Sequence, residues 1–473
     1  MRYTPFETDL DHLEPDDLKV LETVAEGWYI EYKREAISVK AVGKSLSAFA
    51  NHYGGWLFFG VQEADVDGSK CAGAFPGVAL DQLDALLLRI RTGAVHHVSP
   101  TPAFDVKVLK GPASSIQLPE GRAVVAVSIP EGGDTPYVHS SGRIYRRKAD
   151  ESDPVHETDR SVLDLLWERR RRGEERIGRL IDTTPTVSKG EWAQSAYLHL
   201  HLLTEPLATP ADRSGLSLSD FHRLVGLRES SGRMELPLDN VFHCGGDYVG
   251  RHVYENDPAN MTVTYRYRPD CSCLISIPMR VWKPRRSSSA HDSFVQSRKY
   301  GAGFLSLTVQ EGHTDPSVVD LSPVLLQVAM LIHKHREVAL EDGIAGPFHA
   351  KIVLDNVWRV VPFIDTAWYL ERIRKFGTPI MQDERLVVPW LLTDFITLDR
   401  VETPEGKPAD PELLELAGGS LDLIRATLGG LGVPFGLTAD EKGTTEITQL
   451  LEAGIRSVGV TGEEVGDAPA NSN

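Results

Sequence analysis

The chain has 473 residues, of which 41% are hydrophobic and 25% charged, so it is long enough for two to four domains of a soluble globular protein. This composition excludes collagen-like, mainly disordered and disulfide-scaffold proteins, and the net charge of −17 argues against coating nucleic acid through bulk electrostatics. The sequence contains no apolar run long enough to span a membrane and no apolar leader at its start, so we expect a cytoplasmic protein with reduced cysteines and no membrane partner.

The first 180 residues read as an α/β or α+β domain. Their pattern predicts, in chain order, a short helix over 16–21, a strand over 28–32, a helix over 39–51, a buried strand over 56–61, a helix over 80–91, strands over 104–109, 123–129 and 143–147, and a helix over 158–180. The helix over 39–51 is the clearest, because Val42, Leu46 and Phe49 recur at helical spacing.

A linker-like break at 183–186 separates this domain from a second region. There the pattern predicts strands over 197–203 and 351–361, helices over 218–227, 325–336 and 367–376, several strands and turns within 247–283, and an exposed loop over 284–292. We therefore divide the chain into 1–180, an α+β region of unknown role over 190–460, and a disordered tail over 461–473.

Acidic residues bracket an aromatic, strand-prone segment near the N-terminus. Glu26 and Glu31 lie at its two ends, Lys33 shares a strand face with Glu31, and Glu63 lies just past a buried strand. Three converging carboxylates repel one another unless a cation neutralises them, and Mg²⁺ or Mn²⁺ prefers such oxygen ligands. Taken alone the spacing is common in acidic proteins, and solvent-exposed acids are the alternative interpretation.

Several motifs in this region occur in the order found in one family. They are Glu26 with Glu31-Tyr32-Lys33, Ala48-Phe49-Ala50-Asn51, Gly54-Gly55, Phe59-Gly60-Val61, Pro136-Tyr137-Val138 and Ile144-Tyr145-Arg146-Arg147. Over roughly residues 15–175 the chain resembles the Alba-like domain of the Schlafen family. The resemblance implies an α+β fold with a mixed sheet and helices. It also implies a metal-binding active site of Glu26, Glu31 and Glu63, with Glu63 standing where the family has aspartate.

The resemblance makes a metal-dependent endoribonuclease the leading function. It would cleave structured RNA, above all tRNA, with Lys33 offsetting negative charge in the transition state, and a role in phage defence or as a toxin-like effector would fit the family. The alternatives are a non-catalytic regulator that binds DNA or RNA, and a structural or sensor protein. Because one lobe is visible, we also expect a homodimer or a diverged second lobe after residue 190.

Basic residues of the first domain form short clusters suited to a phosphate backbone. The candidates are Arg34, Arg143, Arg146, Arg147, Lys148, Arg169 and Arg170. Strand alternation sends Arg143, Tyr145 and Arg147 to one face and the remaining cations of that strand to the other. For the arginine-rich helix, solubility or pairing with acidic residues is the alternative.

Two further motifs have weaker chemical interpretations. His243, Cys244, Cys271 and Cys273 have ligand types suited to a structural zinc site, although neither pair has the usual two-residue spacer, and buried inert cysteines are the alternative. Gly43-Lys44-Ser45 lies inside the predicted helix and lacks the upstream glycine of a phosphate-binding loop, so we assign it no nucleotide.

Overall fold

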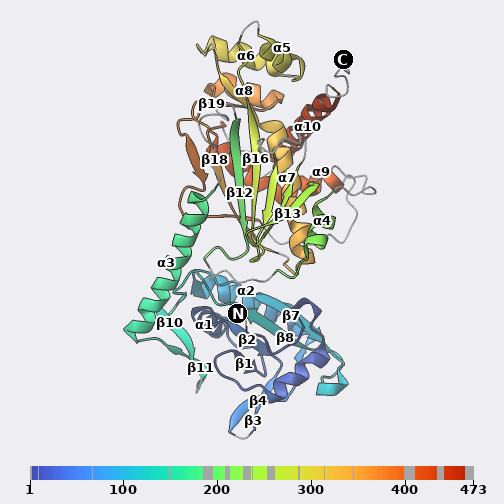
Figure 1. Ribbon diagram of the computed structural model, residues 1–473. Coiled ribbons are helices and arrows are strands. Elements are labelled where there is room, and N and C mark those ends of the chain that lie inside the picture. Colours follow the sequence, from blue (N-terminus) through green and yellow to red (C-terminus); the bar gives the residue numbers. More distant parts are fainter. Residues whose placement is uncertain are drawn as a thin grey trace. The chain divides into compact units, whose positions relative to one another are not determined.

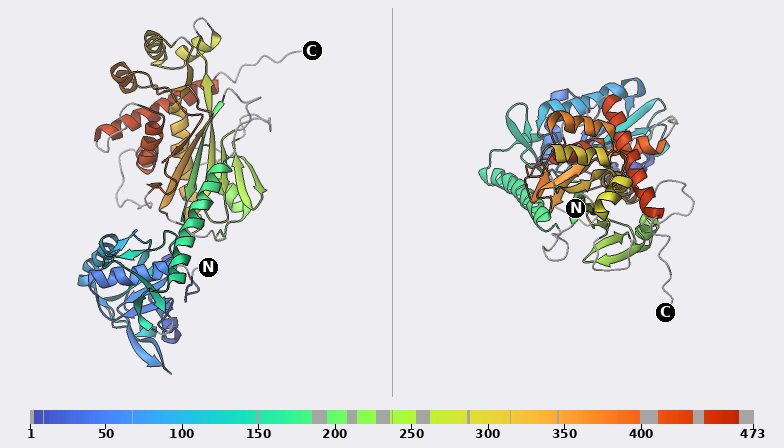
Figure 2. Two further views of the ribbon diagram at one scale, coloured as in Figure 1. Left: turned by 90° about the vertical axis from the view of Figure 1, so that its left-hand side faces the viewer. Right: turned by 90° about the horizontal axis from the view of Figure 1, so that it is seen from above.

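The computed structural model describes residues 3–8, 10–66, 68–148, 151–184, 195–207, 214–226, 236, 238–252, 262–285, 288–313, 315–344, 346–398, 411–433 and 441–463. The chain forms two compact units, shown in Figure 1 and Figure 2. The N-terminal unit comprises Met1–Ile177 with Pro206–Thr209, and the C-terminal unit comprises Gly178–Glu205 with Pro210–Asn473. Both contain helices and sheets, which confirms the predicted α+β class. Within the described residues, no helix is long and apolar enough to cross a membrane.

The N-terminal unit is built around a sheet whose centre is β8 (Arg122–Ile129). The described strands follow the order β1 (Ile30–Lys33), β2 (Gly55–Phe59), β8 and β5 (Val78–Ala79), with β7 (Asp105–Lys110) also paired to β8. Seven of the eight residues of β8 are buried. Its side chains enter one apolar cluster through Val124 and the opposite cluster through Val125, so the strand is packed on both faces.

Helices cover the two faces of this sheet. On one face lie α1 (Val39–Asn51) and α2 (Leu83–His97), and on the other lies the 3-10 helix η2 (Pro15–Thr23). Helix α1 begins at the predicted residue because the Ser38 side chain accepts a hydrogen bond from the Ala41 amide. The predicted helix over 39–51 is confirmed at both ends.

Two small glycine residues allow α1 and α2 to cross closely. A Cβ atom added to Gly43 would lie 2.8 Å from the carbonyl oxygen of Gly93, which is closer than real side chains approach. Gly43 therefore has a packing role within a continuous helix, and the residues around it form no phosphate-binding loop.

A second sheet and a hairpin complete the N-terminal unit. The described strands of this sheet follow the order β11 (Glu151–His156), β10 (Arg143–Lys148), β9 (Val138–His139) and β6 (Val98–Ser99), and the hairpin pairs β3 (Gln62–Val66) with β4 (Ser69–Ala74). Short 3-10 helices are η1 (Leu10–His12), η3 (Leu80–Gln82) and η4 (Ser114–Ile116), and α3 (Arg160–Asp182) follows β11.

The C-terminal unit contains a larger sheet, with ten strands among the described residues. Its main path is β13 (Asn240–Cys244), β14 (Asp247–Arg251), β15 (Thr264–Tyr267), β16 (Cys273–Trp282), β12 (Ser195–Leu203), β18 (Phe348–Asp355) and β20 (Arg385–Val388), with β17 (Ser317–Asp320), β19 (Val360–Phe363) and β21 (Ile396–Leu398) joined to it. The helices are α4 (Leu218–Val225), α5 (Ser289–Gln296), α6 (Gly301–Gln310), α7 (Leu321–Glu341), α8 (Ala367–Phe376), α9 (Pro411–Gly430) and α10 (Glu441–Glu463).

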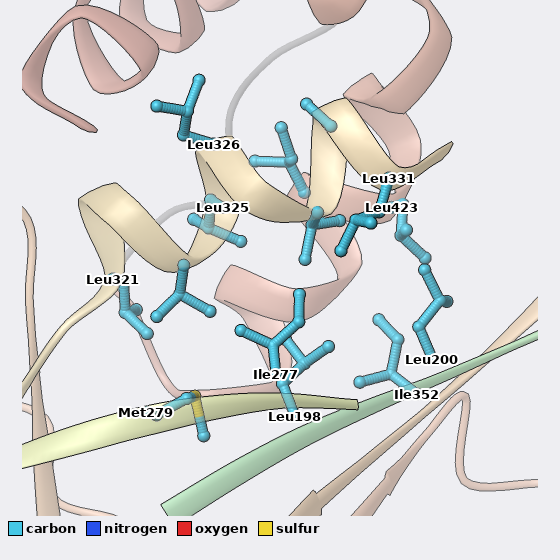
Figure 3. Packing of buried hydrophobic residues seen from close by; sticks show 14 of the residues in the cluster. Leu198, Leu200, Ile277, Met279, Leu321, Leu325, Leu326, Leu331, Ile352 and Leu423 are labelled. Atoms are coloured by element: carbon cyan, nitrogen blue, oxygen red, sulfur yellow. The ribbon is translucent and has the colours of Figure 1, made fainter. Parts of the chain in front are cut away.

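The core of this unit lies between α7 and the long strands β12 and β16. Leu198 and Leu200, two positions apart on β12, project from one face of the sheet toward the side of α7 that carries Leu325, as Figure 3 shows. All three side chains are at most 1% exposed. Every second residue of β12 faces the apolar side of α7. These two apolar patterns, alternation on the strand and helical spacing on the helix, made both elements recognisable from sequence.

Other elements differ from the prediction. Part of the expected loop over 284–292 is helical, because Ser288 caps α5 by accepting a hydrogen bond from the His291 amide. The strand expected over 351–361 is interrupted by a turn in which Asn356 and Arg359 adopt positive φ, so it becomes β18 and β19. Of the predicted disordered tail, 461–463 belong to α10 and 464–473 lie outside the described residues.

Candidate functional site

The loop between Glu26 and Glu31 is anchored from inside the N-terminal unit. The Gly27 amide donates a hydrogen bond to the Ile30 carbonyl (3.1 Å) and closes the loop. The fully buried Arg147 guanidinium donates to the carbonyls of Gly27 (Nε, 2.8 Å) and Ile30 (Nη2, 3.1 Å). The positions of both acidic residues are therefore fixed by an arginine that comes from β10.

Both carboxylate oxygens of Glu31 accept hydrogen bonds from neighbouring side chains. Its Oε2 accepts from Arg147 Nη1 at 3.1 Å, and its Oε1 accepts from Ser45 Oγ and from Lys33 Nζ, each at 3.0 Å. The contact with Lys33 confirms the predicted shared strand face. Because Glu31 is 1% and Arg147 0% exposed, this pair is an internal contact of the fold, and losing either partner would leave the other charge buried and uncompensated. The predicted phosphate contact of Arg147 is corrected accordingly: its guanidinium is inaccessible.

Glu26 differs from Glu31 in having an oxygen without a donor. Its Oε1 accepts from the Tyr32 amide at 2.8 Å, whereas Oε2 is buried without a hydrogen-bond partner among the described residues. The carboxyl group lies against that of Glu63, which Lys70 holds at 3.1 Å. Burial, assisted by Glu63, raises the pKa of Glu26 to about 7 despite the Tyr32 amide and Lys33.

The charge of Lys33 acts on all three predicted acidic residues, and its Nζ contacts Glu31 at 3.0 Å. Burial alone would lower its pKa, but the charge of Glu31, with those of Glu26 and Asp153, raises the pKa above its usual value. Lys33 thus offsets part of the negative charge in the cluster. Within the described part of the chain no group of three or more His, Cys, Asp or Glu side chains is arranged to hold a metal ion. The predicted three-ligand set does not form, because Glu31 is engaged elsewhere; Glu26 and Glu63 remain together.

Replacing Glu26 with glutamine is expected to change how stability depends on pH. The folded-state pKa of about 7 exceeds the ordinary 4.5, so the folded wild type retains a proton that the unfolded chain loses, and its stability falls between these pH values. The variant lacks that fall. After the free energy of the pKa shift is reduced for partial solvent screening, the variant should be more stable than the wild type by about 1–2 kcal/mol near pH 8. Near pH 4 the two proteins should be about equally stable. Thermal unfolding of both proteins at pH 4 and at pH 8 measures this stability difference. If the difference between variant and wild type is the same at the two pH values, the prediction is wrong.

The arginine-rich helix α3 is engaged with its surroundings. Arg169 donates to the carbonyls of His52 (3.1 Å) and Gly132 (3.4 Å), and Arg170 pairs with Asp134 at 2.8 Å. Further along, Arg171 and Arg172 pair with Glu168. These contacts favour the alternative anticipated for this helix, in which its cations pair with acidic residues, and they leave phosphate binding by Arg169 and Arg170 as a prediction.

The other predicted basic residues differ in accessibility. Arg34 and Arg143 are exposed and make no ion pair within the described residues. Arg146 is paired with Glu157 at 2.7 Å and remains 26% exposed, and Lys148 is partly exposed. Arg34 and Arg143 are thus the best placed of the predicted set for a phosphate backbone.

Two lysines of α1 join Arg143 in a group that the sequence reasoning missed. Lys44 Nζ lies 5.1 Å from the ring centroid of Tyr145, to which Arg143 also bonds. Lys40 offers its carbonyl to the buried His139 (3.1 Å). The signal in the sequence was the four-residue spacing of the two lysines on the predicted helix over 39–51, which places them on one face. We call Lys40, Lys44 and Arg143 the basic group.

Asn51, part of the family motif, has a structural role. Its Nδ2 donates to the carbonyls of Tyr137 (2.8 Å) and Tyr145 (3.1 Å), and its Oδ1 accepts from the Tyr137 amide (2.7 Å). The side chain is 1% exposed and ties the end of α1 to β10 and to the segment before β9. A buried amide with both ends satisfied fixes the strand that carries Arg147 and Arg143.

The proposed zinc ligands are not brought together. Cys244 is exposed at the end of β13, whereas Cys273 is buried on β16, and the order β13-β14-β15-β16 separates them by three strand spacings, about 14 Å. With His243 exposed beside Cys244, this prediction is wrong: Cys271 and Cys273 are buried packing residues.

Comparison with known proteins identifies the domain that contains the acidic cluster. The family model described as Schlafen, AlbA_2 matches residues 26–156, from Glu26 to the end of β11. These residues therefore form an AlbA_2 domain of the Schlafen type, which confirms the predicted resemblance and indicates a nucleic-acid-related function. The match covers less than a third of the chain and does not extend to the C-terminal unit.

Two solved structures show more distant similarity. One is the solution structure of the N-terminal domain of a protein from Nitrosomonas europaea described as related to the ATP-dependent DNA helicase RecG, with 20% identity, coverage of 31% of this chain and 92% of that chain, and a TM-score of 0.23. The other is the crystal structure of a protein from Corynebacterium diphtheriae, with 21% identity, coverage of 30% and 24%, and a TM-score of 0.20. No curated protein matches the chain.

Proposed function

We propose that the N-terminal unit binds RNA and cleaves its phosphodiester backbone, with Mg²⁺ or Mn²⁺ held by Glu26 and Glu63. The contact between these two carboxyl groups beside the Lys33 ammonium carries the proposal. The donor set fits a hard divalent cation, since one oxygen of Glu26 lacks a donor and Glu63 is 43% exposed. Glu31 is excluded as a ligand because it already accepts three hydrogen bonds.

The residues of the cluster divide the chemical work. A divalent cation would supply Lewis acidity and an activated water. Lys33 carries a positive charge where negative charge develops on the phosphate. Because the pKa of Glu26 is about 7 without metal, the cation and a proton compete for this carboxylate near neutral pH. Glu31, held by Arg147 and Ser45, orients Lys33.

Structured RNA, with tRNA as the leading example, is the substrate class that this surface suits. The chain has a net charge of −17, so attraction to phosphates must be local. The basic group and Arg34 lie on the same unit as the acidic cluster; Lys40, Arg143 and Arg34 are exposed, and Lys44 is partly exposed. A surface that contacts phosphates with few base-reading groups recognises RNA mainly through its shape.

The test is incubation of the full chain with total tRNA in MgCl₂, MnCl₂ or EDTA. We expect discrete fragments with either metal and none with EDTA, and a MnCl₂-dependent rise in melting temperature that Glu26→Gln abolishes. Intact tRNA together with a gel shift would contradict cleavage and support the second candidate. Failure to bind RNA at all would overturn the proposal.

The second candidate is a non-catalytic regulator that binds RNA or DNA. The neutralisation of Glu31 by Arg147 and Lys33 favours it, because an acidic cluster that holds its own cations needs no metal for stability. If this second function is correct, Glu26→Gln binds RNA as tightly as the wild type, and tRNA stays intact in MgCl₂, in MnCl₂ and in EDTA. A role in phage defence and a homodimeric assembly remain predictions under either function.

Removing charge from the basic group is expected to weaken RNA binding in a salt-dependent way. Lys44→Ala and Arg143→Ala should each lower the slope of log affinity against log salt by about 0.7–0.9, because each loses one phosphate contact. Lys44→Arg should restore the slope. The exposed Lys19 on η2 provides a matched control, and Lys19→Ala should leave the slope unchanged. Equal slopes for Lys44→Ala and Lys19→Ala would exclude the basic group from the interface.

A further inference from the structure

An aromatic group lies on the surface beside the anchored acidic loop. Trp28 is 44% and Tyr53 47% exposed, and their ring centroids are 6.3 Å apart. Around them, Tyr29 lies 6.4 Å from Trp28 and 6.2 Å from Tyr53, while His52 lies 5.8 Å from Trp28 and 4.1 Å from Tyr53. Tyr3 stacks on Tyr29 at 4.4 Å. We call Trp28, Tyr29, His52 and Tyr53 the aromatic group.

The backbone holds these rings in place before any ligand arrives. Trp28 and Tyr29 lie within the loop that Arg147 anchors through Gly27 and Ile30. Tyr53 lies in the turn after α1, and a Cβ atom added to Gly55 would approach the Tyr29 carbonyl to 2.4 Å. The Gly54-Gly55 motif thus permits the turn and the loop to meet. Rings that are already ordered lose little entropy on binding a ligand.

The surroundings of the aromatic group favour an anionic ligand with flat apolar faces. Burial, with the charges of nearby Arg146 and Arg169, lowers the pKa of His52 to about 4, so its ring is neutral, and these two guanidinium groups remain 26% and 23% exposed. Exposed aromatic faces flanked by arginines are the chemistry that binds unpaired nucleobases.

We propose that Trp28 and Tyr53 form a stacking surface for unpaired bases of an RNA strand, whose backbone then passes Glu26. The inference rests on the proposed function for its ligand, and it specifies the part of the substrate that enters the site: a single-stranded loop or end. Glu26 is two residues from Trp28 across the anchored loop, so a base stacked on the indole brings the neighbouring phosphate toward the acidic cluster.

The test compares three probes of equal length, about 12 nucleotides: single-stranded RNA, duplex RNA, and a strand of sugar-phosphate without bases. Trp28→Ala and Tyr53→Ala should each weaken binding of the single strand about 5- to 150-fold. Binding of the duplex and of the baseless strand should change less than about twofold. The salt dependence should stay at the wild-type slope, because no charge is removed. Trp28→Phe should retain most of the affinity.

Trp167→Ala is the matched control, since Trp167 is 57% exposed on α3 and makes no contact with the aromatic group within the described residues. If the wild type binds RNA and Trp28→Ala behaves like Trp167→Ala, the stacking surface is overturned while the proposed function stands. Equal losses on all three probes, or a loss of folding seen by circular dichroism in Trp28→Phe as well, would also overturn it. A wild type that binds none of the probes overturns both proposals.

Discussion

Replacing Arg147 with alanine is expected to lower the local free energy of unfolding of the N-terminal unit by about 3–5 kcal/mol. The change leaves Glu31 buried with a charge that only Lys33 and Ser45 contact. It also removes the guanidinium donor of the Gly27 carbonyl and one of the two donors of the Ile30 carbonyl, and it empties the space against the Phe49 ring. Hydrogen exchange of peptides covering β1 and α1 measures the effect in the full chain without requiring both units to unfold together.

The neighbouring Arg146→Ala is the matched control for this prediction. Arg146 is 26% exposed and pairs with Glu157, so its loss should cost about 1 kcal/mol or less. Removing both buried charges, as Arg147→Met with Glu31→Leu, should recover part of the stability lost in Arg147→Ala. If Arg147→Ala instead exchanges like the wild type and loses RNA affinity, the guanidinium contacts phosphate and its structural role is wrong.

The buried pair changes how variants of the acidic motif should be interpreted. Glu31→Ala removes the partner of a fully buried arginine, so we expect this variant to lose structure in the loop that carries Glu26. A loss of cleavage in Glu31→Ala therefore carries no information about catalysis unless hydrogen exchange shows that the loop is intact. Glu26 and Glu63 are better targets, since neither holds a buried cation in place.

The elements that could be predicted from sequence are those whose apolar residues follow a regular pattern along the chain. The helix over 39–51 and the central strand β8 were recognised because their apolar residues follow one helical face or form a continuous run. On β10 the alternation placed Arg143, Tyr145 and Arg147 on one face, as observed. It could not show that this face turns toward α1, because that depends on contacts between residues about a hundred positions apart.

The sequence predicted most of the residues of the acidic cluster, but not which side chains contact each other. The spacing of Glu31 and Lys33 predicted their contact, which is local to one strand. The third partner, Arg147, is 116 residues away, and nothing in the local pattern distinguishes a buried arginine from its exposed neighbour. The cysteines illustrate the opposite error, since residues with ligand chemistry were grouped although two intervening strands separate them.

Replacing Glu26 with glutamine is expected to reduce RNA cleavage about a hundred- to ten-thousand-fold while leaving RNA affinity within about twofold. Glutamine can keep the hydrogen bond from the Tyr32 amide and can donate to Glu63, so the loop should stay folded. It removes one negatively charged oxygen from the proposed metal site, so the cation is held by Glu63 alone. Binding should persist because removing an acid does not weaken attraction to phosphates.

Single-turnover cleavage of tRNA in MnCl₂, paired with a gel-shift titration in EDTA, separates the two effects. Glu22→Gln on η2 is the matched control, because Glu22 is exposed and makes no contact with the acidic cluster within the described residues. Glu63→Gln should lose activity in the same direction, and occupancy of the site by Mn²⁺ at a low fixed concentration should rise with pH through about 7, because the cation must displace the proton that metal-free Glu26 carries. If Glu26→Gln cleaves like Glu22→Gln, the Glu26–Glu63 contact is a structural feature, and the chemistry lies elsewhere or is absent. If cleavage and affinity fall together, Glu26 acts in binding, and the assignment of a catalytic carboxyl is wrong.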